Sequence, residues 1–245
     1  MRASLQAISG LSICLLLLCL TTPAHAAEGM EVVKSTGHVT SGDIEGAPGQ
    51  YRVNTGAGGR AVVSVGATGF IVVEQNSTVE IDRSGPVEVF RQISGMIYYA
   101  MNKIDRSMRA AEVRTKTAVI GVRGTRFMVV EQPERQEIGM RKGEVRVISP
   151  AEEFEIHRQQ VTDEFAAFRK EGKDAVARER QAFKEYQART QREFVEFKRE
   201  FSLQTDRMVA FSGRRVTETA LSATTRNEMA GLEQFAAEWL SKVRD

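Results

Sequence analysis

The sequence predicts an α+β protein with segregated domains, in which an all-β N-terminal domain is followed by a long amphipathic α-helical hairpin or coiled coil. Up to Ile148, short apolar runs alternate with turns that contain glycine, as is typical of strands. After Pro150, apolar side chains recur at steps of three or four residues among Glu, Lys, Arg and Gln, as is typical of helices. These two patterns predict a β domain over residues 27–149 and a helical region over residues 150–245.

The first 26 residues have the order of a cleavable secretory signal peptide. Arg2 precedes an apolar run from Leu11 to Leu20, and Ala24-His25-Ala26 provides the small residues of a cleavage site. As a helix this run covers only about 15 Å, half of a hydrocarbon core of about 30 Å. We expect cleavage near Ala26 and a periplasmic or secreted protein. The alternatives are an uncleaved anchor in the inner membrane and lipid attachment at Cys19, which lacks the usual small preceding residue.

Composition argues against several classes of function. The chain has 34 Lys and Arg against 32 Asp and Glu, so no global positive charge favours nucleic acid as a partner. Both cysteines, Cys14 and Cys19, lie in the leader, so the mature chain is expected to form neither a disulfide nor a thiolate metal site. We find no motif for a catalytic, metal or cofactor site, and we expect a protein that is not an enzyme.

The β part is expected to be a compact sandwich or a short solenoid-like roll. Its strands include Arg60–Val65, Phe70–Val73, Thr78–Ile81 and Arg126–Val130. The helical part is expected to begin at Ser149, because Ser149-Pro150-Ala151-Glu152 matches a capping box with proline at the first helical position. A helix from Pro150 to Phe211 would be roughly 90 Å long, and Ser212-Gly213 would separate it from a second helix over Val216–Val243.

An ordered series of motifs in the β part resembles the FecR domain family. An Asn-Ser turn comes before a strand, a glycine leads the next strand, a Gly-Thr-x-Phe motif follows and a Gly-x-Val strand ends the series. The residues that carry it, and to which we assign a structural role, are Asn76, Ser77, Gly95, Gly124, Thr125, Phe127 and Gly143. At Gly124 we expect a tight backbone position, with Phe127 buried and the Thr125 hydroxyl bonded to a turn amide.

The resemblance implies a periplasmic domain. The best-known members of this family are membrane regulators of iron-citrate uptake, with a cytoplasmic region that binds a sigma factor and a periplasmic domain that receives a signal from an outer-membrane receptor. Here the leader occupies the place of the cytoplasmic region, so we expect the stand-alone, exported type. The ligand, the signal and any role of iron stay open.

Two sets of residues are candidates for contacts with partners. The first is a basic region, a candidate contact for an anionic envelope polymer or an acidic partner, or else a solvated strand face: Lys103, Arg106, Arg109, Arg114, Lys116, Arg123 and Arg126. The second is an aromatic stripe in the predicted helix, a candidate for self-association or for packing within the chain: Phe183, Tyr186, Phe194, Phe197, Phe201 and Met208.

The sequence therefore predicts a binding, scaffold or interaction module of the cell envelope without enzymatic activity. Its partner would be an envelope protein or an anionic envelope polymer, and a homo-oligomer through the helical tail is possible on this pattern. The alternative is an accessory component of cell-surface signalling, which passes a cue to a separate membrane or sigma regulator.

Overall fold

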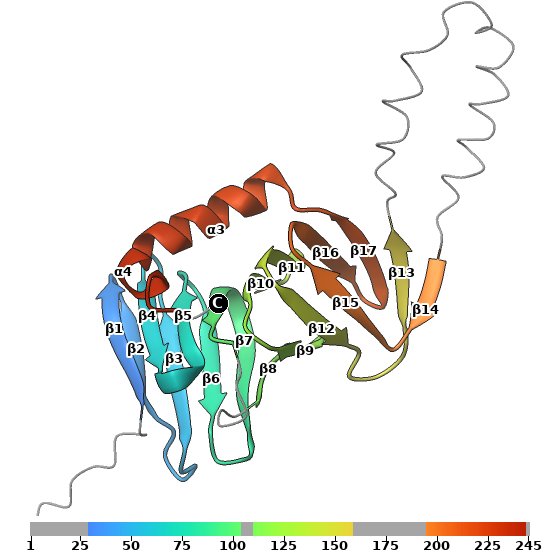
Figure 1. Cartoon of the computed structure of the whole chain (residues 1–245). Helices are drawn as coiled ribbons and strands as arrows, with labels where there is room; N and C mark the ends of the chain where they lie inside the picture. Colours follow the sequence, from blue (N-terminus) through green and yellow to red (C-terminus); the bar gives the residue numbers. More distant parts are fainter. Residues whose placement is uncertain (1–28, 104–109, 159–194, 244–245) are drawn as a thin grey trace, which may run out of the picture.

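The structure is a computed structural model, and it describes residues 29–103, 110–158 and 195–243. Within these ranges, 17 strands form two stacked sheets, which share one long strand, β7 (Val87–Met101) (Figure 1). Two helices follow the last strand, α3 (Ala223–Phe235) and α4 (Ala237–Leu240). The described part of the chain is therefore mostly β structure.

The first sheet, which we call sheet A, contains the second half of β7. In spatial order its strands are β1 (Met30–Thr36), β4 (Arg60–Val65), β5 (Gly69–Val73), β7, β10 (Arg126–Gln132), β11 (Arg135–Lys142), β16 (Arg207–Ser212), β17 (Arg215–Ala220), β13 (Phe154–Arg158) and β14 (Val195–Lys198). All neighbours pair antiparallel except β17 and β13, which are parallel.

The second sheet, sheet B, contains the first half of β7. Its order is β2 (Val39–Asp43), β3 (Gln50–Thr55), β6 (Thr78–Asp82), β7, β8 (Ala110–Arg114), β9 (Val119–Val122), β12 (Glu144–Ile148) and β15 (Glu200–Gln204). A single turn of 3-10 helix, η1 (Gly66–Thr68), connects β4 to β5. Strands from both ends of the chain therefore contribute to each sheet.

The main hydrophobic core lies between the two sheets. Its central aromatic side chains are Phe127, which stacks on Tyr99 at 5.0 Å between ring centroids, and Phe90, which meets Tyr99 edge-on. The C-terminal strands belong to the same core, because Ile156, Phe201 and Val216 are buried in it. Successive side chains of a strand point to opposite faces of its sheet. Alternate residues of each strand can therefore enter the core between the two sheets.

A second apolar cluster lies on the outer face of sheet A, where α3 and α4 cover it (Figure 1). Tyr98 and Met128 face outward from the sheet, and Met229 and Leu232 of α3 are buried against that face. The close approach depends on Gly139 of β11, because a Cβ atom there would lie 2.9 Å from Thr225 Cγ2. The described chain thus has three layers, namely sheet B, sheet A and the helices.

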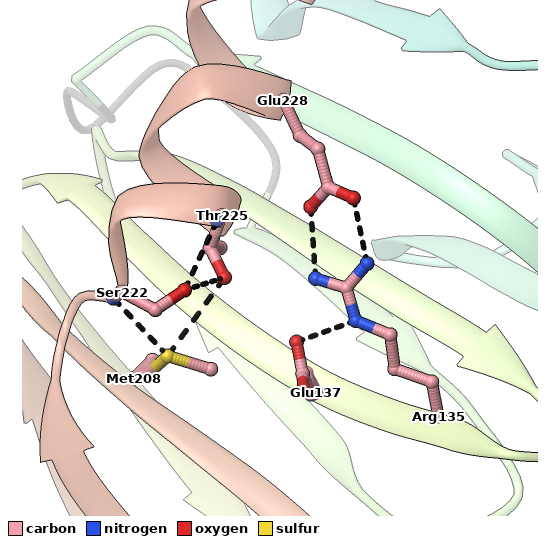
Figure 2. A network of polar contacts seen from close by, with 6 residues as sticks. All are labelled: Arg135, Glu137, Met208, Ser222, Thr225 and Glu228. Atoms are coloured by element: carbon pink, nitrogen blue, oxygen red, sulfur yellow. Dashed lines mark hydrogen bonds and ion pairs between the residues drawn. The ribbon is translucent and has the colours of Figure 1, made fainter.

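Polar contacts fix the start of α3 on sheet A. Ser222 caps the helix, because its side chain accepts a hydrogen bond from the Thr225 amide at 3.0 Å. Figure 2 shows this cap beside a fork in which the two terminal nitrogens of Arg135 donate to the Glu228 carboxylate at 2.7 and 2.8 Å. The same Arg135 also donates to Glu137 at 2.8 Å. These contacts join the helix to β11 and fix its position along the sheet.

The prediction of a long helical hairpin or coiled coil is wrong for the described residues. Residues 154–158 and 195–220 form the strands β13 to β17. In β15 the side chains alternate strictly, with Phe201 and Leu203 buried between exposed neighbours, and this period of two fits a sheet. Asp206, at φ 61°, lies in the turn between β15 and β16, and Gly213, also at φ 61°, lies in the turn that leads to β17. The part of the predicted helix over residues 159–194 lies outside the described residues.

The second predicted helix, over Val216–Val243, is correct only in its later part. Its beginning is strand β17, and helical structure starts at Ala223. Ser149 does not cap a helix either. Its hydroxyl bonds to the Glu152 carbonyl and its amide donates to the Arg199 carbonyl at 2.9 Å, which closes a turn between β12 and β13. The same Ser-Pro sequence suits a turn when a neighbouring strand can satisfy its backbone groups.

Candidate interaction surface

Three of the motif residues meet where β7 passes from sheet B to sheet A. Gly95 lies at this point with φ 92°, and a Cβ atom on it would be 2.0 Å from the Ser77 Oγ. Ser77 is buried, and its Oγ accepts a hydrogen bond from the Met96 amide at 3.0 Å. Asn76 lies in the turn before it, with φ 55°. The Asn-Ser turn and the glycine therefore form one structural unit that lets a single strand serve both sheets.

We predict that Gly95→Ala destabilises the protein by about 2 kcal/mol or more. The cost comes from the positive φ, about 1–3 kcal/mol for a residue with a side chain, together with the collision with Ser77. Gly42→Ala on β2 is the matched control, because nothing lies within 4 Å of a Cβ atom there. Urea unfolding followed by circular dichroism measures both. Equal stability of the two variants would contradict this account of the crossing.

The remaining motif residues form a second unit around Gly124. A Cβ atom on Gly124 would lie 2.7 Å from the Lys103 Cα, and one on Gly143 would lie 2.8 Å from the Thr125 Cγ2. The carbonyl of Thr125 accepts a hydrogen bond from the Met101 amide at 3.0 Å. Its hydroxyl, in contrast to our expectation, has no hydrogen-bond partner within the described part of the chain. Both units thus serve the packing of strands.

The described members of the basic region separate into two groups at opposite ends of β10. Lys103 touches Gly124 and lies with Arg123 and Arg126 near the start of that strand. Lys116 instead lies near enough to Glu131, at the far end, to lower its pKa. Arg126 and Glu131 are five positions apart on this strand, which corresponds to about 17 Å. Arg114 forms an ion pair with Glu112, and Arg106 and Arg109 lie outside the described residues. The described residues thus do not form one continuous basic patch. The candidate contact stays a prediction.

The side-chain carboxyl of Glu131, near Lys116, has a raised pKa. The residue is buried, and burial raises the pKa of its carboxyl, while a hydrogen bond from Thr115 and the charge of Lys116 oppose the rise. An acid whose pKa is raised on folding binds its proton more tightly in the folded state. Its contribution to stability therefore increases as pH falls toward the ordinary carboxyl range and decreases as pH rises.

We accordingly predict a pH-dependent effect of Glu131→Gln. At neutral pH the variant avoids the cost of burying a charge, so its stability relative to the natural protein is greatest there. As pH falls toward 5, the natural protein gains stability that the variant lacks. Urea unfolding at both pH values measures the difference, and a constant difference between them would contradict the prediction.

The aromatic stripe does not form one surface among the described residues. Phe201 is buried in the main core, and Met208 is buried under α3. Phe197 is the exception, because 59% of its surface is exposed. Phe183, Tyr186 and Phe194 lie outside the described residues. Two of the six predicted residues are therefore engaged within the chain, and one is available to a partner.

Phe197 lies on β14, at the end of sheet A (Figure 1). This strand pairs with β13 on one side, with Phe197 opposite Glu155 and Val195 opposite His157. No other described strand pairs with its second side. Val195 and Phe197 point to the same face, and 36% of the surface of Val195 is exposed. We call these residues, with Glu196 and Lys198, the β14 edge.

Charged side chains occupy the other face of the β14 edge. The Glu196 carboxylate contacts the Lys198 ammonium at 2.6 Å, and the pKa of Glu196 is lowered chiefly by this contact. Arg158 of β13 lies 3.9 Å from the same carboxylate and 3.0 Å from Glu218. The edge therefore combines a side that pairs with no described strand, an exposed aromatic ring and paired charges.

The described residues contain no group of three or more His, Cys, Asp or Glu side chains that could hold a metal ion. Neither described helix is long and apolar enough to cross a bilayer.

The described residues form a two-sheet β protein in which one side of β14 pairs with no described strand. Residues 51–160 match the family described as FecR protein. This match confirms, for residues 51–160, the resemblance to the FecR family that the ordered motifs indicated. No curated protein matches the chain in sequence at a significant level.

Among solved structures, the chain is similar to two crystal structures of a candidate anti-sigma factor from Parabacteroides distasonis, at 2.50 and 1.65 Å resolution. Each shows 11% sequence identity and a TM-score of 0.36, with 81% of this chain covered. The match spans 62% of the length of that protein.

Proposed function

We propose that this protein is an exported FecR-domain protein that acts as a protein-binding module of the cell envelope. The observation that carries the proposal is the β14 edge, where an exposed phenylalanine lies on a strand with one side that pairs with no described strand. An exposed edge strand can pair with a strand of another chain. Proteins usually prevent this with charged side chains, with a twist of the edge or with a segment that covers it. Export is supported by the order of residues 1–26, which resembles a signal peptide.

Strand addition explains how such a module recognises a partner without a pocket. Backbone hydrogen bonds along the edge provide affinity, and side chains at alternate positions provide specificity. Phe197 would supply the apolar contact of this surface, because a large aromatic ring buries more area than its neighbours on the strand. The FecR motif residues support the edge indirectly, by building the two sheets on which it lies.

The test compares two single substitutions in cells. Phe197→Asp places a charge in the proposed contact, whereas Ile93→Asp changes an exposed apolar residue far from β14 in the sheet order, 38% exposed on β7. After cross-linking of the envelope, proteins recovered with the natural chain should be lost with the Phe197 variant and kept with the Ile93 variant. Equal recovery with both variants would contradict a role for the β14 edge.

A second candidate function is supported by the FecR domain itself, since the resemblance implies a place in cell-surface signalling. In this case the module passes a cue to a separate membrane or sigma regulator. Deletion of the protein should then change the transcription of a defined set of genes, and Phe197→Asp should reproduce that change. A transcriptome that is unaffected by deletion would exclude signalling and leave the binding module.

A further inference from the structure

We propose that the β14 edge pairs with the β14 edge of a second copy of this chain, antiparallel and about a two-fold axis at Phe197. This inference rests on the proposed function, in which the edge is a binding surface, and it names the partner. The pairing would join sheet A of one copy to sheet A of the other.

The charge order of the strand selects this partner. In the sequence Glu196-Phe197-Lys198, an acid and a base lie at equal distances on either side of the aromatic residue. When two antiparallel strands place Phe197 opposite Phe197, each Glu196 lies opposite Lys198 of the other copy. Opposite charges in directly facing positions stabilise a strand pair, and like charges destabilise it. The strand is therefore complementary to itself in one register.

Neighbouring registers lose this complementarity. A two-fold axis at Glu196 would place two carboxylates opposite each other, and an axis at Lys198 would place two ammonium groups opposite each other. An axis between Glu196 and Phe197 would leave the charged groups opposite apolar residues. Only the register centred on Phe197 pairs all four charges and brings the two exposed rings together.

Contacts already present within one copy are compatible with this arrangement. Glu196 and Lys198 lie on one face of the strand and contact each other at 2.6 Å. Across the axis they would form a cluster of four alternating charges, while the two Phe197 rings would meet on the opposite face. The second side of β14, which no described strand occupies, would supply the backbone groups for the new pairing.

The contact involves one short strand from each copy, so the interface has a small area. Interfaces of small area give weak and reversible complexes.

Sedimentation velocity of the purified protein over a wide concentration range should show a monomer that converts to a dimer. Phe197→Ala should weaken this conversion, and its circular dichroism spectrum should match that of the natural protein because the ring is exposed.

Charge exchange is the decisive test. Glu196→Lys alone and Lys198→Glu alone each replace two attractive pairs by two repulsive ones, and each should weaken dimerisation about tenfold or more. The double variant Glu196→Lys with Lys198→Glu restores both pairs and should restore the dimer. In the natural chain Arg158 contacts Glu218 at 3.0 Å, and none of these substitutions changes either residue of that pair. Failure of the double variant to recover would overturn the pairing.

A covalent test locates the axis. In a background with Cys14→Ser and Cys19→Ser, Phe197→Cys places one thiol in each copy at the position that faces itself. Directly opposite residues of antiparallel strands lie close enough for a disulfide. Oxidation should give a dimer that Thr40→Cys, on the β2 edge of sheet B, does not give. Equal cross-linking at both positions would overturn the assignment of the axis.

The outcomes also separate this inference from the proposed function. If the protein stays monomeric at all concentrations, but Phe197→Asp still abolishes recovery of envelope proteins, the second copy is the wrong partner and the binding edge stands. If the charge exchange restores a dimer, while envelope proteins are recovered equally with all variants, the self-pairing stands and the partner-binding role falls.

Discussion

Replacement of Glu88 by alanine is expected to lower the free energy of unfolding by about 3 kcal/mol, because it removes a fully buried carboxylate together with its contact to Arg83 and the hydrogen bond that it accepts from the buried Thr68 hydroxyl. The Glu88 side chain is fully buried, and its carboxylate contacts Arg83 Nε at 2.9 Å. Its second oxygen accepts a hydrogen bond from the Thr68 hydroxyl. One carboxylate therefore connects η1, the turn after β6 and the start of β7.

A matched control is Glu80→Ala on β6. Glu80 also contacts two arginines, Arg52 at 2.6 Å and Arg91 at 3.0 Å, but those two side chains are 47% and 44% exposed. Exposed ion pairs contribute little, so we expect a change of about 1 kcal/mol or less. Urea unfolding followed by circular dichroism measures both variants. A loss for Glu88→Ala no larger than that for Glu80→Ala would contradict the structural role of the buried pair.

The second large effect is expected at Phe127, the aromatic residue of the Gly-Thr-x-Phe motif. Phe127→Ala should cost about 3–5 kcal/mol, because it removes a fully buried ring from the main core and leaves a cavity. The ring stacks on Tyr99 at 5.0 Å, so the loss also removes an aromatic contact at the centre of sheet A.

Phe197→Ala makes the same chemical change on the same sheet and separates structure from recognition. Its ring is 59% exposed, so the free energy of unfolding should change by about 0.5 kcal/mol or less. Chemical denaturation of both variants tests this contrast. Comparable losses at the two positions would mean that Phe197 is a core residue, and the β14 edge would then lose its main argument.

The FecR domain could be predicted from the sequence because its motifs combine local requirements. The glycines at positions 95 and 124 indicate a backbone with positive φ, which residues with a side chain rarely adopt, and the structure has positive φ at both. The apolar runs of the β part are likewise typical of strands, so these strands could be predicted from the sequence. The pairing of β7 with both sheets was not predictable, because it depends on contacts between strands far apart in the chain.

The C-terminal region was predicted wrongly for a physical reason. Phe194, Phe197 and Phe201 are spaced by three and four residues, which suits a helix, and the intervening charged residues favour one. In the structure Phe197 and Phe201 belong to different strands, and in β15, the strand of Phe201, buried and exposed side chains alternate with a period of two. Pairing of β15 with β12 and of β16 with β11 outweighs the weak helical preference. The strict alternation from Glu200 to Gln204 was the available signal.

The candidate surface was predicted only in part. Phe197 belonged to the expected aromatic stripe, but its isolation at an open edge follows from the sheet order, which the sequence does not encode locally. Likewise, the basic residues appeared continuous along the chain, whereas β10 separates Lys103 from Lys116 by its own length. Position in a sheet, and not spacing in the sequence, decides which of these side chains can act together.

The most direct test of the central claim, that the β14 edge binds another protein chain, is site-specific photo-cross-linking in living cells. A photoreactive residue at position 197 is compared with one at position 40 on β2, one of the two outer strands of sheet B. The account predicts discrete cross-linked species at position 197, containing either a second copy or another envelope protein, and none at position 40. Absence of any adduct at position 197 would contradict the claim.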